Sequence, residues 1–286
     1  MWLYLSILSA IFAGFTTVVM KKCSSKNNPI KISLLGLLIG NIAYVLIGAF
    51  TTDVIQNFDV TNLFKIAPLS IIQSLGYICA ILSVKYASVT TVSPIRKCNT
   101  AVTLLLGIIV LHEKFTFLQL ILAITLIILT ILLAKSKEKV NYVQENKGIL
   151  FAYGFVIFNG IAGFLNKVYI NVFENPLVVT FYYGIVIIIG VLFYCLVTKR
   201  WNYIDIRKVN YKALFLLHSA LDLGANLCSR FSLIDGPVSI VSVITSSSII
   251  ITILASRLIL KEKISWKKYI MITGIILCVF ALALIK

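Results

Sequence analysis

The chain has 286 residues, of which 60% are apolar and 13% charged, whereas soluble domains average about 45–50% apolar and about 25% charged. This composition excludes an ordinary water-soluble globule, because so much apolar surface would be exposed to water. The 26 Lys and Arg against 10 Asp and Glu do not indicate nucleic-acid binding, because they lie in short gaps between apolar runs and form no single patch.

Ten apolar runs approach the length of about 20 residues that a membrane-spanning helix needs. The first lacks the basic start of a signal peptide and is therefore predicted to be a membrane helix. Backbone polar groups in hydrocarbon must be satisfied within their segment, so all ten are predicted to be helices of an all-α integral membrane protein. The runs are 2–20, 32–50, 66–84, 88–111, 117–134, 148–166, 177–197, 213–232, 237–260 and 269–285.

The prolines fall into two groups by their position relative to the ten predicted helices. Pro29, Pro176 and Pro237 are predicted to open helices, where a missing N–H costs little. Pro94 lies inside the 88–111 run, where it frees the carbonyl of residue 90 and can mark a bend of the backbone around a ligand.

Two parts of the sequence resemble each other. Residues 83–114 align without a gap with residues 232–263, and both stretches end in Glu-Lys, at 113–114 and 262–263. Residues 11–14 and Lys21 pair in the same way with residues 157–160 and Lys167. The repeat holds five spans, and because five is odd, the second unit is predicted to be inverted relative to the first. We expect the first five-helix repeat over 1–135, a loop over 136–147 and the second repeat over 148–286.

Basic residues are divided unevenly between the loops. Counted from the N-terminus, the odd-numbered loops carry most of them, and the even-numbered loops carry Lys65, Lys114, Lys167 and, at the edge, Arg230. The positive-inside rule then makes the odd loops cytoplasmic and both termini external. We expect a multi-pass protein of a bacterial plasma (inner) membrane.

These features resemble the drug/metabolite transporter superfamily, specifically its EamA-type ten-helix permeases. The resemblance covers essentially the whole chain and is carried by IFAGFTTVVMKK (11–22), IFNGIAGFLNK (157–167), HEKFT (112–116) and KEKIS (261–265). It implies a basket of ten helices around a central cavity lined by spans 1, 3, 4, 6, 8 and 9, working by alternating access. It does not identify the substrate, because one fold serves many metabolites in this family.

Arg96 and Lys97 depart from the family, whose fourth spans are mostly small and apolar at this depth. They lie roughly 12–14 Å into their helix, close to the bilayer midplane. One interpretation is that Lys97 snorkels to the surface and Arg96 pairs internally. We favour the other, a positively charged wall for an anionic or zwitterionic substrate, because buried charges are costly and rarely face lipid. The aligned residues of the second half are Thr245 and Ser246.

The eighth span carries polar residues at every fourth position, which places them on one helix face. They are His218, Asp222, Asn226 and Arg230. Gln73 and Tyr77 align with Asp222 and Asn226, so two related helices both show a polar stripe. This favours a shared cavity over interhelical hydrogen bonding.

Asp222 is the predicted partner of Arg96 or Lys97, or alternatively the carrier of a coupling proton. His218 is a candidate relay, although a satisfied structural histidine is the more common case. Weaker binding candidates, for which helix packing is the alternative, are Thr16, Thr17, Asn159, Asn166 and the cluster of hydroxyls from Thr245 to Ser248, with Thr245 and Ser246 foremost. Lys21 and Lys167 are predicted to snorkel.

No enzyme is predicted, because the chain has two His and neither HExxH nor GxSxG. The six Cys show no CxxC spacing, so no metal site is expected, and no cofactor either.

The predicted function is alternating-access transport of an anionic or zwitterionic compound such as an amino acid, by an exporter or permease acting as a monomer or homodimer. The alternatives are a transporter of cationic or quaternary-amine compounds and a non-transporting scaffold or channel. The expected partners are a small-molecule substrate, the lipid bilayer and a candidate coupling proton, with no nucleic acid.

Overall fold

The structure is a computed structural model that describes residues 1–112, 116–135, 142–261 and 266–284. Within these residues all regular structure is helical, as the composition predicts. The Glu-Lys pairs at 113–114 and 262–263 lie outside the described residues. The α-helices are α1 (Trp2–Ser25), α2 (Pro29–Thr51), α3 (Val60–Tyr86), α4 (Val89–Lys97), α5 (Asn99–Leu111), α6 (Phe117–Lys135), α7 (Tyr142–Phe173), α8 (Pro176–Thr198), α9 (Lys212–Asp235), α10 (Val238–Ser246), α11 (Ser248–Ile259) and α12 (Trp266–Leu284).

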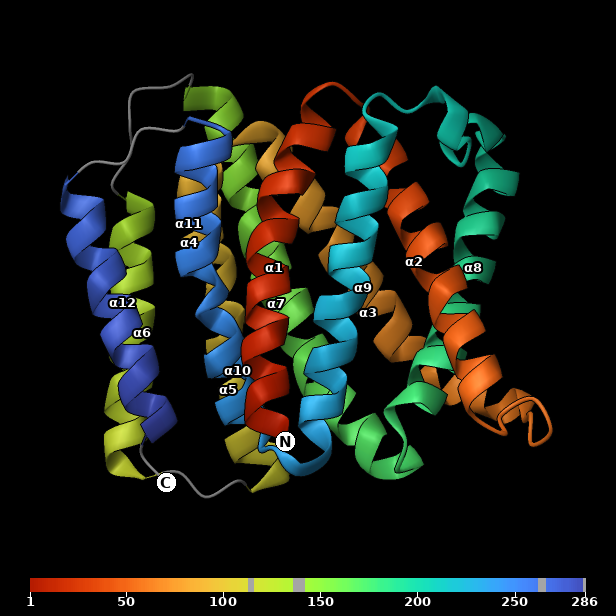
Figure 1. The fold of residues 1–286 in the computed structure, drawn as a ribbon, viewed down its shortest axis with the longest axis horizontal. Coiled ribbons are helices and arrows are strands. Elements are labelled where there is room, and N and C mark those ends of the chain that lie inside the picture. The colour runs from red at the N-terminus through yellow and green to blue at the C-terminus, as the bar shows by residue number, and fades with distance from the viewer. Residues whose placement is uncertain (113–115, 136–141, 262–265, 285–286) are drawn as a thin grey trace.

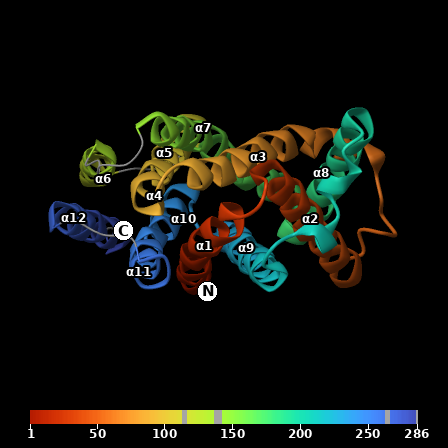
Figure 2. The same cartoon turned by 90° about the horizontal axis from the view of Figure 1, so that it is seen from above.

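The helices run side by side along one direction, and the start of α1 and the end of α12 lie at the same end of the molecule (Figure 1). Seen from above, α1, α3, α7 and α9 occupy the middle (Figure 2). The pair α6 and α12 packs together at one edge, and the pair α2 and α8 at the other. The short 3-10 helices Trp201–Tyr203 and Ile206–Lys208 lie between α8 and α9.

Seven helical segments of the described residues are long and apolar enough to cross a membrane. Large apolar side chains such as Phe50, Phe117 and Trp266 are exposed on the outside of the molecule, where lipid would solvate them. The protein is therefore a multi-pass integral membrane protein. The seven do not include α6, α9 and α12, so the expected number of ten spans stays a prediction.

Equivalent Asn-Pro pairs begin α2 and α8. The side chain of Asn28 accepts a hydrogen bond from Ile30 N at 3.0 Å, and that of Asn175 accepts one from Leu177 N at 2.9 Å. Each Asn thus satisfies an N–H that a helix start leaves free, and the proline that follows needs no such partner. The predicted role of Pro29 and Pro176 is confirmed.

Two expected helices are interrupted. The runs 88–111 and 237–260 were predicted to be continuous, but the first breaks at Cys98, between α4 and α5, and the second at Ser247, between α10 and α11. The chain continues in the right-handed helical region at both residues, with φ/ψ of −63°/−12° and −62°/−14°. Pro94 does not explain the break, because α4 continues through it and the aligned residue of the second half is Val243.

Lys21 and Lys167 were predicted to snorkel. The structure shows a different role for both. Each instead caps the C-terminal end of a neighbouring helix, α3 for Lys21 and α9 for Lys167. The last carbonyl groups of a helix lack partners and carry partial negative charge, so an ammonium group there is stabilising. The acceptors are Val84 O at 2.6 Å and Ala87 O at 2.8 Å for Lys21, and Leu233 O at 2.6 Å and Gly236 O at 3.2 Å for Lys167.

Two glycines mark close helix crossings, α1 on α11 and α7 on α5. A Cβ atom at Gly14 would lie 2.6 Å from Ile251 Cβ, and one at Gly160 would lie 2.5 Å from Val102 Cβ. At both crossings a threonine hydroxyl donates to the glycine carbonyl. The pairs are Thr252 to Gly14 at 3.2 Å and Thr103 to Gly160 at 2.8 Å.

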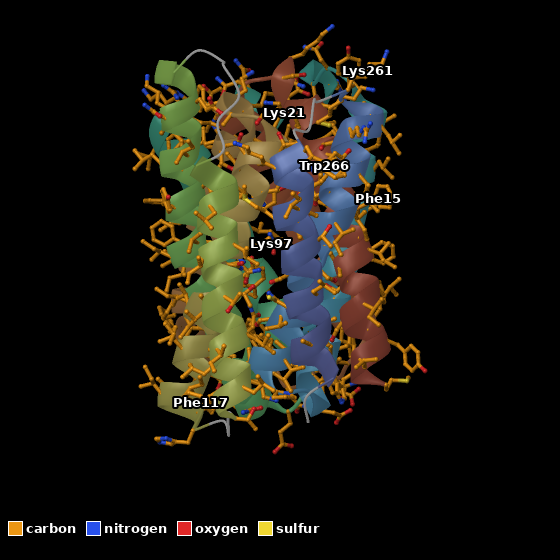
Figure 3. The ribbon with its side chains drawn as sticks, turned by 90° about the vertical axis from the view of Figure 1, so that its left-hand side faces the viewer. Phe15, Lys21, Lys97, Phe117, Lys261 and Trp266 are labelled. Carbon is orange, nitrogen blue, oxygen red and sulfur yellow. The ribbon has the colours of Figure 1, made fainter. Side chains whose placement is uncertain are left out.

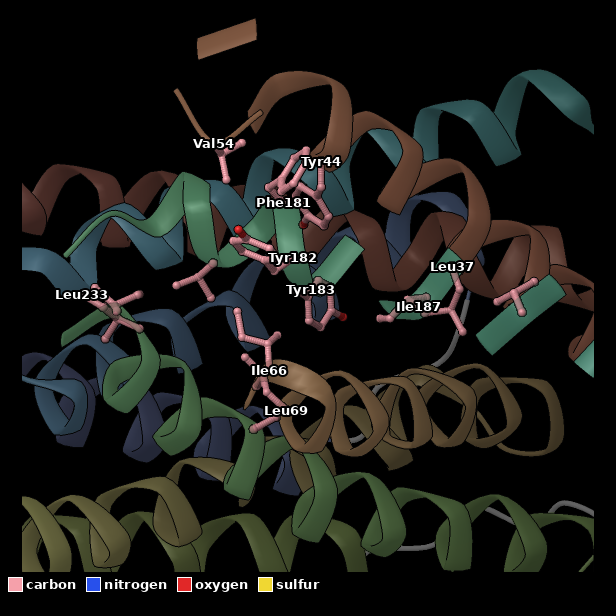
Figure 4. Packing of buried hydrophobic residues seen from close by; sticks show 14 of the residues in the cluster. Leu37, Tyr44, Val54, Ile66, Leu69, Phe181, Tyr182, Tyr183, Ile187 and Leu233 are labelled. Atoms are coloured by element: carbon pink, nitrogen blue, oxygen red, sulfur yellow. The ribbon is translucent and has the colours of Figure 1, made fainter. Parts of the chain in front are cut away.

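A cluster of buried apolar residues, several of them aromatic, packs α8 against α2 and α3 (Figure 4). Tyr182 is 1% exposed, and its ring meets that of Phe181 edge-on at 5.5 Å. Tyr44 of α2 meets Tyr183 in the same way at 6.3 Å. This packing fixes Tyr44 and Tyr183 beside the cavity described next.

Candidate functional site

A cavity of about 250 Å³ lies between the central helices. All ten residues predicted to bind a substrate line it: Thr16, Gln73, Tyr77, Arg96, Lys97, Asn159, Asp222, Asn226, Thr245 and Ser246. Its walls include side chains of α2 and α8, such as Asn41 and Tyr183, in addition to the spans that the family resemblance implies. Lys97 lies midway along the helices, between Lys21 near one end and Phe117 near the other (Figure 3).

The cationic wall stands where α4 ends. The Arg96 guanidinium lies over the Phe155 ring, 4.4 Å from its centroid, and its Nε and Nη1 atoms have no hydrogen-bond partner. Asp222 forms no ion pair within 4.0 Å with Arg96 or Lys97, so the predicted direct pairing is absent. The wall thus keeps donors that a bound anion could use.

His218 stands behind the cavity surface and is fully buried. Its Nε2 atom shares a hydrogen bond with the Tyr77 hydroxyl at 3.0 Å, and the two rings stack with centroids 6.3 Å apart. Tyr77 lines the cavity, whereas His218 is not among the lining residues. This arrangement favours the structural interpretation, in which His218 holds Tyr77 in place.

Arg230 was counted at the edge of a loop, which is wrong. It lies within α9 and is 2% exposed. Its guanidinium lies 4.5 Å from the centroid of the Tyr183 ring and 5.6 Å from that of Tyr44, and its Nη2 donates to Gln73 Oε1 at 3.4 Å. The four-residue stripe that contains Asp222 continues to Arg230, and that continuation was the signal for a buried position.

The weaker candidates behave in two ways. The hydroxyls of Thr16 and Thr245 donate within their own helices, to Phe12 O at 2.8 Å and Ser242 O at 3.0 Å, as the packing alternative expects. The hydroxyl groups of Ser246 and Thr100 share a hydrogen bond that joins α10 to α5. The side chain of Asn159 makes no hydrogen bond within the described protein and borders the cavity.

A sequence model of the EamA-like transporter family matches residues 1–135 and 146–285. The chain belongs to the EamA-like transporter family. It is thus a member of a membrane transporter or permease family, as the resemblance implied. A solved structure described as "Crystal structure of protein" is 13% identical and aligns over 96% of this chain and 96% of its own, with a TM-score of 0.67. At this identity the likeness concerns the fold alone. No curated protein gives a significant match.

Proposed function

We propose that this EamA-family protein transports a small anionic or zwitterionic metabolite, such as an amino acid, by alternating access. The observation that supports the proposal is the pair Arg96 and Lys97, which borders the cavity together with one acid among the described lining residues, Asp222. A cation inside a membrane protein is costly when it lacks a partner. A carboxylate that accepts charge-assisted hydrogen bonds from Arg96 would supply one.

We further propose that the ten spans form two inverted five-helix repeats, over 1–135 and 148–286, joined by 136–147. Equivalent helices make equivalent contacts, which supports this arrangement: α1 packs on α9 as α7 packs on α3, and α1 packs on α11 as α7 packs on α5. The aligned breaks at Cys98 and Ser247 also support it. Alternating access by rocking of two such halves around a central site is common among secondary transporters. External termini and a bacterial inner membrane location complete the proposal.

Thermal unfolding of the purified protein tests the substrate class. A ligand that binds only the folded state raises the unfolding midpoint. We expect an amino acid or organic acid to raise it, among a panel that also holds sugar phosphates, nucleosides and quaternary amines. Arg96→Gln should abolish the shift, and the matched surface change Lys22→Gln should preserve it. If only quaternary amines stabilise the protein, and Asp222→Asn abolishes that shift, the cationic alternative replaces the proposal.

Flux in proteoliposomes separates transport from the alternatives of another class. A transporter saturates with its substrate, a channel does not saturate over the same range, and a scaffold moves nothing. The ligand found by thermal shift should enter proteoliposomes with a saturable rate. Asp222→Asn should change the dependence of that rate on pH if Asp222 carries the coupling proton, and an unchanged pH profile would remove Asp222 from this role.

A further inference from the structure

A second, smaller cavity adjoins the first. It measures about 60 Å³ and shares Asn226, Ser229 and Thr245 with the larger one. Its own lining includes Arg230 and Asn166, which are 2% and 8% exposed. Arg230 Nη1 and Asn166 Oδ1 have no hydrogen-bond partner, although both atoms are fully buried. Unsatisfied buried polar groups are rare and costly, so this pair calls for an explanation.

The Arg230 guanidinium borders the smaller cavity and contacts side chains that line the larger one. Arg230 follows Asp222 by eight residues on α9, a rise of about 12 Å along the axis. Side chains on a helix lean toward its N-terminus, which brings the guanidinium back toward the level of Asp222. The residues that contact the guanidinium support this position, because Tyr44, Tyr183 and Gln73 all line the larger cavity. Arg230 therefore borders a cavity that adjoins the larger one, apart from the wall of Arg96 and Lys97.

The charges around the two cavities do not balance. Arg96, Lys97 and Arg230 are cationic, and Asp222 is the one acidic residue among the described side chains that line either cavity. An excess of two positive charges is expensive in the interior of a membrane protein. A substrate with two negative charges would neutralise it, and the separation of the cations favours two acid groups over one doubly charged group.

We infer that the substrate is a dicarboxylate, with one carboxylate bound by Arg96 and Lys97 and the other by Arg230 Nη1. This inference rests on the proposed function and narrows its substrate class. An acidic amino acid also has two carboxylates, but its ammonium group lowers its net charge to minus one, so it would offset half of the excess. Asn166 Oδ1 is the acceptor available to this ammonium group beside the second carboxylate. Tyr44 and Tyr183 hold the guanidinium in position through their rings, and Gln73 orients it through its hydrogen bond.

The test compares each dicarboxylate with its half-amide, which has the same shape and one charge fewer. The pairs are succinate with succinamate and glutamate with glutamine, and glycerol 3-phosphate serves as a doubly charged probe with a single acid group. Dissociation constants come from the concentration dependence of the unfolding midpoint. In at least one of the two pairs, the wild type should bind the dicarboxylate roughly 10- to 100-fold more tightly than the half-amide. This is the range expected for hydrogen bonds to a charged group.

Two variants locate the preference at Arg230. Arg230→Gln removes the charge, and Gln73→Glu leaves Arg230 in place but offers it a carboxylate of nearly the same shape. Both should bring the ratio of the two dissociation constants close to one. Arg257→Gln is the matched control, because Arg257 also lies over a tyrosine ring but is exposed on α11. It should leave the ratio unchanged.

The outcomes are distinct. Equal affinity of the wild type for dicarboxylates and half-amides overturns the inference, as does tighter binding of glycerol 3-phosphate than of any dicarboxylate, or an Arg230→Gln protein that keeps the full preference. If half-amides still stabilise the protein in an Arg96-dependent way, the proposed function survives this failure. If no acid stabilises the wild type at all, both fail together.

Discussion

The lysine that caps α3 offers a direct test of what holds the helix ends together. Lys21→Met removes the ammonium group and keeps an unbranched apolar stem. The change deletes the hydrogen bonds from Nζ to Val84 O and Ala87 O, which are 2.6 and 2.8 Å long. Because the last carbonyls of α3 then lose a cationic partner, we expect the folded protein to be destabilised.

The size of the effect follows from the contacts. Hydrogen bonds that involve a charged group contribute about 1.5–3 kcal/mol, and a cation at a helix C-terminus adds about 0.3–1 kcal/mol. Lys21 is half-buried, so solvent screens part of this and a loss of about 2–3 kcal/mol in the free energy of unfolding is expected. For a large domain, this corresponds to a midpoint lowered by roughly 5–10 °C.

The neighbouring lysine supplies the control. Lys22 is exposed, so Lys22→Met should change the free energy of unfolding by no more than about 0.5 kcal/mol. Lys167→Met, which removes the equivalent cap from the end of α9, should resemble Lys21→Met. The assay is thermal unfolding of the purified variants in one detergent. Equal midpoints for Lys21→Met and Lys22→Met would refute the reasoning, since they would show that the cap adds nothing.

Two further changes test other parts of the frame. Gly160→Ala would place a Cβ 2.5 Å from Val102 Cβ. Overpacking of this kind should destabilise the protein by about 1–3 kcal/mol. A midpoint of thermal unfolding equal to that of the wild type would contradict the close crossing. Hydrogen bonds from the Thr61 hydroxyl and N–H hold the pKa of the Asp59 carboxyl below its usual range. The ionised carboxylate at this N-cap of α3 therefore stabilises the fold at neutral pH. Its contribution is lost as the pH falls through the lowered pKa. Asp59→Ala should therefore lower the midpoint at pH 7 and have little effect at acidic pH, and an effect independent of pH would argue against an ionised cap.

Hydropathy located the helices well and their ends poorly, for a physical reason. It detects the part of a helix that lies in hydrocarbon, whereas hydrogen bonds decide where the helix begins and ends. The 66–84 run belongs to α3, which starts at Val60 because Asp59 caps it. The 148–166 run is the centre of α7, which reaches from Tyr142 to Phe173. The breaks at Cys98 and Ser247 were not predicted, because the polar residues beside them, Arg96-Lys97 and Thr245-Ser246, were interpreted as binding candidates within continuous helices.

The candidate site was predictable at several positions where a polar side chain interrupts an apolar run, but not at Asn41, which also interrupts one and lines the cavity. Arg96, Asp222 and Asn159 stand out for this reason, and all three border the cavity. Tyr44 gave no such signal, because tyrosine is common in membrane helices and the run around it shows no polar stripe. The absence of an ion pair between Arg96 and Asp222 could not be predicted from the sequence either. Helix spacing gives the face on which a residue lies but not its distance from a residue on another helix.

The two halves agree where they build the frame and differ where they face the cavity. The crossing glycines, the capping lysines and the residues at the helix breaks occupy aligned positions and make matching contacts. Around the cavity, the aligned pairs are chemically different: Arg96 with Thr245, Lys97 with Ser246, Gln73 with Asp222 and Ile81 with Arg230. A duplicated frame constrains both halves to the same packing, but a small asymmetric substrate needs different groups on each side. The positions at which the halves depart from each other are therefore where substitutions should change which substrate is bound, and the matched positions are where they should change stability.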